Sequence, residues 1–385
     1  MRSWAEIDLD AIESNIKEIR RITNPNSKIM AVIKADAYGH GFFEMAEILA
    51  LNGADCFAVA TVEEALQIRR AGFEQDILIL GGVDESSLGD LIKNNITLTA
   101  YTYTFAKSVS DTALNINKTA KIHIKLDTGM SRIGFVTGED NDEEIADEII
   151  KISKLDNIFV EGIFSHFSTS DEKNEAYTRL QFSRFMKMCD LIEEKGLKIP
   201  IKHIANSAAI MQYPEMHLDM VRPGIILYGL YPSDDVDKNR LSLTPAMTMK
   251  SVITHVKELP KGRGISYGKE YITDSTMKIA TVPIGYADGY QRIFAREGHM
   301  LVKNQKVKIL GRICMDQCMI DVTNVNNINT GDEVIIFTKD KITADSLAEW
   351  AGTINYEIVC MISKRIPRIY LKDGRMVKVV NYLNC

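Results

Sequence analysis

Residues 55–82 read DCFAVATVEEALQIRRAGFEQDILILGG, and this stretch decides the fold class. An apolar run at each end flanks a segment with helical spacing at residues 61–71. Thr61 followed by Glu64 matches a capping box, which predicts that a helix begins there. An apolar strand, a helix and a second apolar strand in succession are typical of a parallel sheet.

The same alternation extends along the first part of the chain. Eight β-like runs lie at residues 28–35, 55–60, 76–82, 97–102, 121–127, 160–166, 202–207 and 220–227. Helical spacing recurs between them, for example at residues 143–155 and 174–195. Eight βα units in about 240 residues is the size of a (β/α)8 barrel, a TIM-type fold. The rival fold, an open doubly wound sheet, usually has fewer strands, and no GxGxxG follows the first run.

The pattern changes after Ser242. The later strand-like runs are short and alternating, at residues 250–256, 278–283, 306–310, 317–322, 333–337 and 376–380. Helical spacing persists mainly around residues 343–351. We therefore predict a barrel domain of residues 1–242 and a mostly β C-terminal domain of residues 243–385, joined by a linker at residues 231–243.

Charge and hydropathy exclude several classes of protein. The 385 residues hold 46 Lys and Arg against 52 Asp and Glu, a formal net charge of −6. This balance gives no general case for a nucleic-acid or membrane partner. No apolar run reaches the roughly 18 residues of a spanning helix. Glu6, Asp8 and Asp10 stand where a signal peptide would be apolar, so we expect a cytoplasmic protein.

The cysteine pattern does not indicate a disulfide framework or a metal site. No CxxC occurs, and the i, i+4 pair Cys314 and Cys318 is a poor zinc signature without histidines nearby. In a reducing compartment we expect free thiols. The six cysteines are Cys56, Cys189, Cys314, Cys318, Cys360 and Cys385.

Barrel enzymes place their sites at the carboxyl ends of the strands, so the polar residues there are candidates. Lys34 ends the first run, where partial desolvation would make its amine nucleophilic. The alternative is a surface lysine just past the strand. Ser207 and the pair Gly224 and Ile225 follow the seventh and eighth runs, the usual place for a phosphate in barrels. A lysine facing a phosphate site suggests pyridoxal phosphate, held as a Schiff base.

The segment AVIKADAYGHG at residues 31–41 closely resembles the cofactor-lysine signature of bacterial alanine racemases. Further motifs match the same family, in its order and over essentially the whole chain: WAEIDLDAIESN, KLDTGMSRIGF, SHFSTSDE, ANSAA, VRPGIILYG, ISYG, IGYADGY, GRICMDQCMID and NYEIVCMISKRIPRIY. The resemblance implies a (β/α)8 barrel with a β-rich domain, and a homodimer in which that domain completes the partner's active site. It also implies interconversion of L-alanine and D-alanine with pyridoxal 5'-phosphate, supplying D-alanine for peptidoglycan.

The resemblance assigns roles to individual residues. Lys34 is the Schiff-base lysine and one of two acid/bases, and Tyr267 of the other protomer is the opposite base. Arg222 faces the pyridine nitrogen, and Lys125 stands where many members carry a carbamylated lysine. The further matches are cofactor contacts at Tyr38, His166, Ser207, Gly224, Ile225 and Tyr356, substrate contacts at Arg132 and Met315, and an entryway of Asp171, Tyr286, Arg292 and Arg312. One departure is Ser131, where many members have glycine.

Other functions stay open at this point. A serine or broad-specificity racemase would share the fold, but such relatives tend to change the position of Tyr356, and its tyrosine favours alanine. A barrel decarboxylase of basic amino acids would want an acidic residue where Arg222 stands. A cofactor-binding protein built from a lone barrel would leave the residues after Ser242 unexplained.

Overall fold

The computed structural model describes residues 1–383 and divides the chain into two compact units. The barrel unit comprises Glu13–Ala37 and Phe42–Leu243. The β-rich unit comprises Met1–Ile12, Tyr38–Gly41 and the chain from Thr244 onward. The first strand of the chain thus belongs to the β-rich unit. The functional division into residues 1–242 and 243–385 stays a prediction.

An eight-stranded parallel sheet forms the centre of the barrel unit, which confirms the predicted fold class. Its strands follow the order β10-β2-β3-β4-β5-β6-β8-β9. The amides of Asp219 and Arg222 donate to the carbonyls of Lys202 (3.1 Å) and Ala205 (3.0 Å). These bonds bring β9, at the end of this order, beside β10 at its start. The strands are β2 (Lys28–Val32), β3 (Cys56–Val59), β4 (Asp76–Ile79), β5 (Ile96–Ala100), β6 (Ala120–Asp127), β8 (Ile158–Phe164), β9 (Ile201–His203) and β10 (Met220–Val221), and β7 (Phe135–Val136) pairs with β6.

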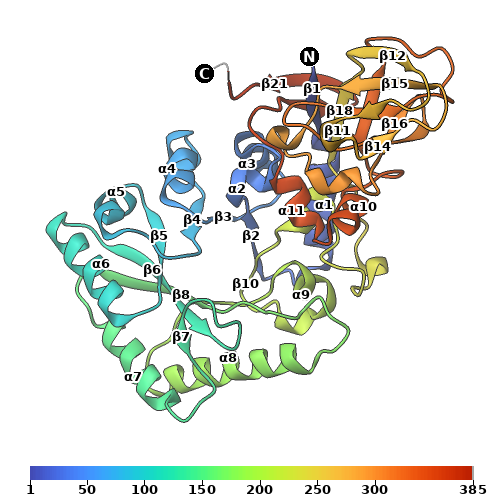
Figure 1. Cartoon of the computed structure of the whole chain (residues 1–385). Coiled ribbons are helices and arrows are strands. Elements are labelled where there is room, and N and C mark those ends of the chain that lie inside the picture. Colours follow the sequence, from blue (N-terminus) through green and yellow to red (C-terminus); the bar gives the residue numbers. More distant parts are fainter. Residues whose placement is uncertain (384–385) are drawn as a thin grey trace. The chain divides into compact units, whose positions relative to one another are not determined.

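Helices follow the strands and cover the outside of the sheet, as Figure 1 shows for α4, α5 and α6. The strands bury both faces, which is why their sequences are almost continuously apolar. The capping box at the start of α4 is confirmed: the Thr61 hydroxyl accepts from the Glu64 amide, and the Glu64 carboxylate accepts from the Thr61 amide, both at 3.3 Å. The helices are α1 (Leu9–Ile22), α3 (Phe42–Leu51), α4 (Val62–Arg70), α5 (Leu88–Lys93), α6 (Tyr103–Asn115), α7 (Asp142–Ser153), α8 (Ala176–Glu194) and α9 (Ser207–Gln212).

Two predicted strands are shorter than their apolar runs. The eighth run was expected to continue to residue 227, but only Met220–Val221 is a strand. Pro223 has no amide hydrogen for a sheet, and the chain turns at Gly224 into the 3-10 helix η3 (Ile225–Tyr228). The first strand ends at Val32, because the left-handed turn α2 (Lys34–Tyr38) follows.

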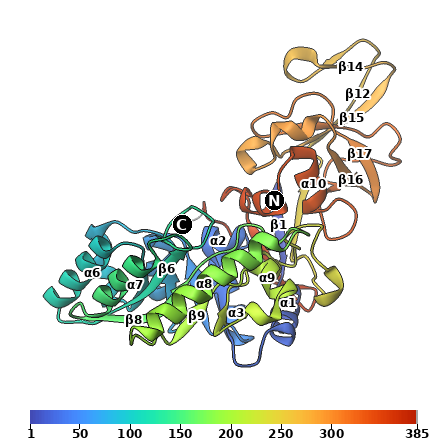
Figure 2. The ribbon, with the colours of Figure 1, turned by 90° about the horizontal axis from the view of Figure 1, so that it is seen from below.

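The β-rich unit contains three sheets (Figure 2). A seven-stranded sheet has the order β17-β16-β19-β11-β1-β20-β21, and the smaller sheets are β12-β15-β18 and β13-β14. The strands are β1 (Ser3–Asp8), β11 (Met247–Val252), β12 (His255–Leu259), β13 (Gly264–Ile265), β14 (Tyr271–Ile272), β15 (Met277–Val282), β16 (His299–Val302), β17 (Gln305–Lys308), β18 (Cys318–Asp321), β19 (Glu333–Phe337), β20 (Arg368–Lys372) and β21 (Arg375–Val380). The helices are α10 (Ala344–Ala351) and α11 (Asn355–Cys360).

The sequence pattern missed part of this unit. The single run expected at residues 250–256 is two strands, β11 and β12, that belong to different sheets. The strand β1 was not predicted, although Ser3, Ala5 and Ile7 alternate inward along it. Its partners are β11 and β20, which lie more than 200 residues away in sequence, so local periodicity gave no sign of the pairing.

Two features of the described residues bear on the protein's class. No helix within residues 1–383 has the length and apolarity to cross a bilayer. The cysteines in that range are free thiols at Cys56, Cys189, Cys314, Cys318 and Cys360, whereas Cys385 lies outside the described residues.

Candidate active site

Lys34 lies just past the carboxyl end of β2, where the sequence predicted a nucleophilic lysine. It begins α2, in which Ala35, Asp36, Ala37 and Tyr38 all have φ of 53° or 54°. This left-handed conformation costs L-residues roughly 1–2 kcal/mol each, so four in succession need external support.

Glu64 and Asp36 supply part of that support. The Glu64 carboxylate accepts from the amides of Ala35 (2.6 Å) and Ala60 (2.8 Å), in addition to closing the capping box of α4. The Asp36 carboxylate accepts from the amide of Phe42 at 3.0 Å. The sequence reading treated Glu64 only as a capping residue, and its proximity to the lysine turn was missed.

The residues predicted to bind phosphate come together in the barrel unit. Ser207 begins α9 and Gly224 precedes η3, and the Gly224 amide donates to the Ser207 hydroxyl at 2.9 Å. Asn206 caps α9 by accepting from the Ala209 amide at 3.0 Å. Ser207 and Ile225 are buried. A hydroxyl and backbone amides at the start of two short helices form a donor set suited to an anion.

Arg222 is a buried cation with no carboxylate among its described partners. Its Nη1 donates to Nδ1 of His203 at 2.7 Å. Its Nη2 donates to the carbonyls of Ser165 (2.7 Å) and Ile204 (3.0 Å) and faces Nδ1 of His166 at 3.3 Å. Burial, followed by the charge of Arg132, lowers the pKa of Arg222 to about 9, so it remains a cation at neutral pH.

Lys125 shares this cationic environment. Its Nζ donates to the carbonyl of Leu126 at 2.7 Å and lies 5.1 Å from the centre of the Phe164 ring. Burial, then the charges of Arg222 and Arg132, lower the pKa of Lys125 to about 7. Lys125 therefore loses its proton far more readily than an exposed lysine does.

The loop after β6 carries Arg132. The Asp127 carboxylate accepts from the amides of Gly129 and Ser131, both at 2.9 Å, and so fixes the turn before the arginine. Arg132 itself is exposed. Ser131, the departure noted in the sequence, has φ of 57°, the left-handed region that glycine adopts without strain.

His166 follows β8 and is a neutral imidazole. Burial and the neighbouring cations, Arg222 first among them, hold its pKa well below the usual value for histidine. Because arginine can only donate, Nδ1 of His166 must be the acceptor. Hydrogen bonds extend from Arg222 through His203 and His123 to Glu161, and sequence reasoning missed these three residues. A lone histidine in an apolar run is more often a packed core residue.

Three of the other predicted residues, Tyr267, Tyr286 and Met315, lie on loops of the β-rich unit that hydrogen bonds join. The Ser266 hydroxyl donates to the Arg312 carbonyl at 2.6 Å, which links the loop of Tyr267 to that of Met315. The amide of Tyr286 donates to the Cys314 carbonyl at 3.2 Å. Tyr267 is 68% exposed and Met315 is 52% exposed. These side chains therefore present an open surface in the single chain.

An ion pair between a buried carboxylate and a partly exposed arginine anchors one of these loops. Asp288 is fully buried, accepts from the Gly285 amide at 3.0 Å and binds Arg2 at 2.6 Å through both carboxylate oxygens. A Cβ at Gly285 would lie 2.3 Å from the Cys314 carbonyl oxygen, so only glycine permits this approach. The sequence reading did not single out Asp288, although it lies within the IGYADGY motif.

The remaining predicted residues are spread over both units. Tyr38 and Tyr356 lie in the β-rich unit with ring centres 6.2 Å apart, and burial raises the pKa of Tyr38. Arg312 pairs with Glu270 in that unit, and Arg292 is exposed there. Asp171 belongs to the barrel unit, where its carbonyl accepts from Ser233 at 2.6 Å. The expected entryway therefore draws on both units, and its assembly stays a prediction.

The fold and the barrel-unit residues define a class: a (β/α)8 barrel enzyme followed by a β-rich unit, with a lysine after the first barrel strand. Comparison with known proteins narrows the class. The family models for the alanine racemase N-terminal domain and C-terminal domain match residues 7–232 and 246–370. The chain belongs to the alanine racemase family.

Individual relatives agree over nearly their whole length. Alanine racemase of Clostridium tetani is 50% identical over 384 residues, covering 99% of this chain and 98% of the relative. Alanine racemase of Methanococcus maripaludis is 53% identical over 371 residues, covering 96% and 98%. The solved alanine racemase of Clostridium difficile 630 is 45% identical with a TM-score of 0.96, covering 100% and 99%.

Proposed function

We propose that the protein interconverts L-alanine and D-alanine with pyridoxal phosphate, supplies D-alanine for peptidoglycan and acts in the cytoplasm. The observation that carries the proposal is a buried cationic group, Arg222 and Lys125, at the strand ends where Lys34 also lies. A family match over 99% of the chain supports the same reaction.

The residues present fit pyridoxal phosphate. Ser207 and the amides around Gly224 and Ile225 would hold the phosphate, and Lys34 would hold the aldehyde carbon. Arg222 would face the pyridine nitrogen, and His166 would lie against the ring. Bound pyridoxal phosphate supplies an electron-withdrawing ring that acidifies the Cα–H bond of the amino acid.

Two bases on opposite faces explain racemisation without a moving base. Lys34 Nζ would exchange a proton on one face of Cα and Tyr267 Oη on the other. Lysine and tyrosine have reference pKa values near 10, so their surroundings must favour the free bases. For Lys34 we propose that the cations Arg132 and Arg222, which lower the pKa of Lys125, would have the same effect.

Arg222 also bears on the fate of the proton. Arginine cannot accept a proton, so Arg222 would keep a pyridine nitrogen beside it unprotonated. Negative charge at the amino acid Cα would then be less delocalised, which would favour return of the proton to Cα over side reactions such as transamination. A decarboxylase would use an acidic residue at this place, so Arg222 argues against that alternative.

The first test is chiral analysis of alanine. Purified protein with added pyridoxal phosphate should convert either enantiomer of alanine to an equal mixture. L-Serine and L-lysine should turn over far more slowly, since we propose that the Tyr356 position restricts the pocket to a methyl group. A faster reaction on serine would favour the broad-specificity alternative, and release of CO2 from lysine would favour the decarboxylase.

We propose further that two copies share their sites, because Tyr267 is 68% exposed in the single chain. Inactive Lys34→Ala protein mixed with inactive Tyr267→Phe protein should regain activity. Under random exchange about half of the dimers are mixed, and each has one site free of both substitutions. Subunit exchange must be confirmed by a tag on one variant. Exchange without recovered activity would reject the shared site.

We propose that Lys125 is carbamylated. A pKa of about 7 leaves a neutral amine whose nitrogen can bond to the carbon of CO2, with one proton released to water. The product carries one negative charge, which would compensate the cations Arg132 and Arg222. Incubation with 13C-bicarbonate should give one carbamate carbon signal, which is lost in Lys125→Gln. If the signal is the same in that variant, another amine is modified.

A further inference from the structure

A chain of hydrogen bonds runs through the barrel unit from Arg222 to Glu161. Arg222 Nη1 donates to Nδ1 of His203 at 2.7 Å. Nε2 of His203 lies 2.9 Å from Nδ1 of His123. Nε2 of His123 lies 3.3 Å from a carboxylate oxygen of Glu161. Both histidines are buried, with exposed fractions of 1% or less.

The two ends of the chain determine the protonation of both histidines. Arginine only donates, so His203 accepts at Nδ1 and carries its hydrogen on Nε2. His123 then accepts at Nδ1 and donates from Nε2 to Glu161, which as a carboxylate only accepts. Protonating either ring would place two donors face to face. Burial lowers the pKa of both histidines, in agreement with neutral rings.

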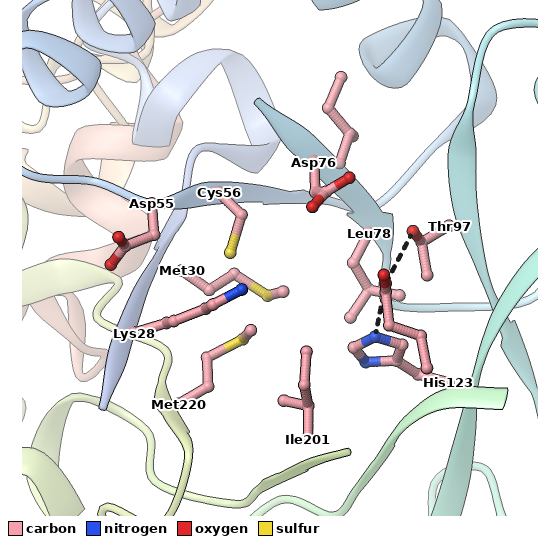
Figure 3. A pocket seen from close by; sticks show the side chains of 12 residues that line it. Lys28, Met30, Asp55, Cys56, Asp76, Leu78, Thr97, His123, Ile201 and Met220 are labelled. Atoms are coloured by element: carbon pink, nitrogen blue, oxygen red, sulfur yellow. Dashed lines mark hydrogen bonds and ion pairs between the residues drawn. The ribbon is translucent and has the colours of Figure 1, made fainter. Parts of the chain in front are cut away.

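Glu161 lies at the amino-terminal end of the strands, away from Lys34. It lines a cavity of about 20 Å³, room for about one water molecule, together with Lys28, Asp76 and Met220 from the starts of three strands. Figure 3 shows Thr97 and His123 beside this cavity, and dashed lines mark the hydrogen bond of each to Glu161. Burial opposes the ionisation of the Glu161 carboxyl group. Hydrogen bonds from His123 and Lys121 outweigh this effect and lower the pKa of Glu161 to about 2.

The residues around these hydrogen bonds leave space for the two histidine rings and pack against them. A Cβ at Gly162 would lie 2.6 Å from the His123 ring, so glycine makes the space for that imidazole. The Phe164 ring stacks on His203 at 4.9 Å and 6°. The same ring lies 5.4 Å from the Arg222 guanidinium carbon. His203 and Arg222 are therefore held both by hydrogen bonds and by contact with one aromatic ring.

We propose that Glu161 is a positioning residue for the racemisation: by accepting from Nε2 of His123, it completes the hydrogen-bond chain that holds both neutral rings in place, and His203 in turn holds the Arg222 guanidinium. This proposal rests on the proposed function, in which Arg222 faces the cofactor. The amino-terminal end of a barrel usually contributes only stability, so the test must separate the two roles.

The test reads histidine tautomers by long-range 1H–15N correlation in the full-length protein labelled with 15N-histidine, with and without pyridoxal phosphate. Wild-type His123 and His203 should each show one neutral Nε2–H form. Glu161→Leu should change both signals, whereas Glu161→Gln should keep them, because an amide oxygen also accepts. Gly162→Ala, which displaces the His123 ring, should mimic Glu161→Leu. Asp76→Asn is the matched control, since it lines the same cavity and pairs with Lys121 but lies outside the chain.

Kinetics on the same loaded proteins complete the test. Glu161→Leu should lower kcat about tenfold with little change in KM for alanine, and Glu161→Gln should recover most of it. Unchanged His203 signals in both Glu161→Leu and Gly162→Ala would overturn the proposal, as would an equal loss of kcat in Asp76→Asn. If the wild-type protein does not racemise alanine, the proposed function fails while the tautomer result still stands or falls separately.

Discussion

The barrel unit and the loops of the β-rich unit hold their site residues in opposite ways. In the barrel unit Arg222, Lys125 and Ser207 are buried, and each has at least one hydrogen bond within the unit. In the β-rich unit Tyr267 and Met315 are largely exposed, although hydrogen bonds hold their loops together. The barrel half is thus organised within one chain, whereas the tyrosine side chain of the other half is open to solvent in the single chain. Substitutions in the first half should change stability and activity together, and those in the second should change activity alone.

The largest effect is expected at Lys34. Lys34→Ala should lose nearly all racemisation, because the substitution removes one proposed base and the proposed cofactor attachment together. The measurement is borohydride trapping of the cofactor on the protein, followed by peptide mass spectrometry. Wild-type protein should carry the label at Lys34, and the same adduct in Lys34→Ala would refute the assignment.

Tyr267→Phe should remove the other base at little cost in stability. The exposed ring loses only a hydroxyl, so the thermal midpoint should move by less than about 1 °C. We propose that Tyr267 acts on the face from which L-alanine loses its proton and Lys34 on the other, so proton abstraction from L-alanine should fall far more than solvent-deuterium exchange into D-alanine. Tyr271→Phe, a substitution in the nearby strand β14 and outside the predicted site, is the control. An equal loss in both directions would contradict two separate bases.

Sequence pattern alone predicted more of the barrel unit than of the β-rich unit, for a physical reason. Strands buried on both faces are apolar along their length, so residues 55–82 alone indicated a parallel sheet. Polar residues at strand ends, such as Lys34 and Ser207, could then be placed by topology. In the β-rich unit, spacing did not distinguish Tyr267 from other tyrosines, and only the family resemblance singled it out.

The missed residues share another property: each acts through a partner distant in sequence. His123 and His203 are 80 residues apart, and either alone resembles a packed core histidine. The buried Asp288 carboxylate pairs with Arg2 near the start of the chain, and β1 pairs with β20 near its end. Local pattern carries no information on such pairs until the fold brings them together.

Replacement of Lys125 should reveal how far the buried positive charge lowers the free energy of unfolding. The pKa of Lys125 falls from 10.5 in the unfolded chain to about 7, so the cost develops as pH falls through that range and is complete below pH 7. In CO2-free buffer Lys125→Met should raise the free energy of unfolding by on the order of 2 kcal/mol at pH 6.5, after allowing for the lost hydrogen bond to Leu126.

The measurement is urea unfolding of both proteins at pH 6.5 and pH 10. The advantage of Lys125→Met should shrink at the higher pH, because wild-type Lys125 is then neutral in the folded state. Added bicarbonate should stabilise only the wild type if the carbamate forms. A difference in stability that does not vary with pH would show that packing, and not charge, decides the effect.

The smallest effect is expected at Ser131, on the loop that carries Arg132. Its φ of 57° strains a residue with a Cβ, and glycine relieves that strain but gains entropy in the unfolded chain. Ser131→Gly should therefore stabilise the protein by only about 0.5 kcal/mol. The hydrogen bond from its amide to Asp127 persists, so KM for alanine should stay within about twofold of wild type. Ser131→Ala keeps the strain and should give no gain in urea unfolding. If alanine stabilises as much as glycine, the hydroxyl and not the backbone angle is responsible.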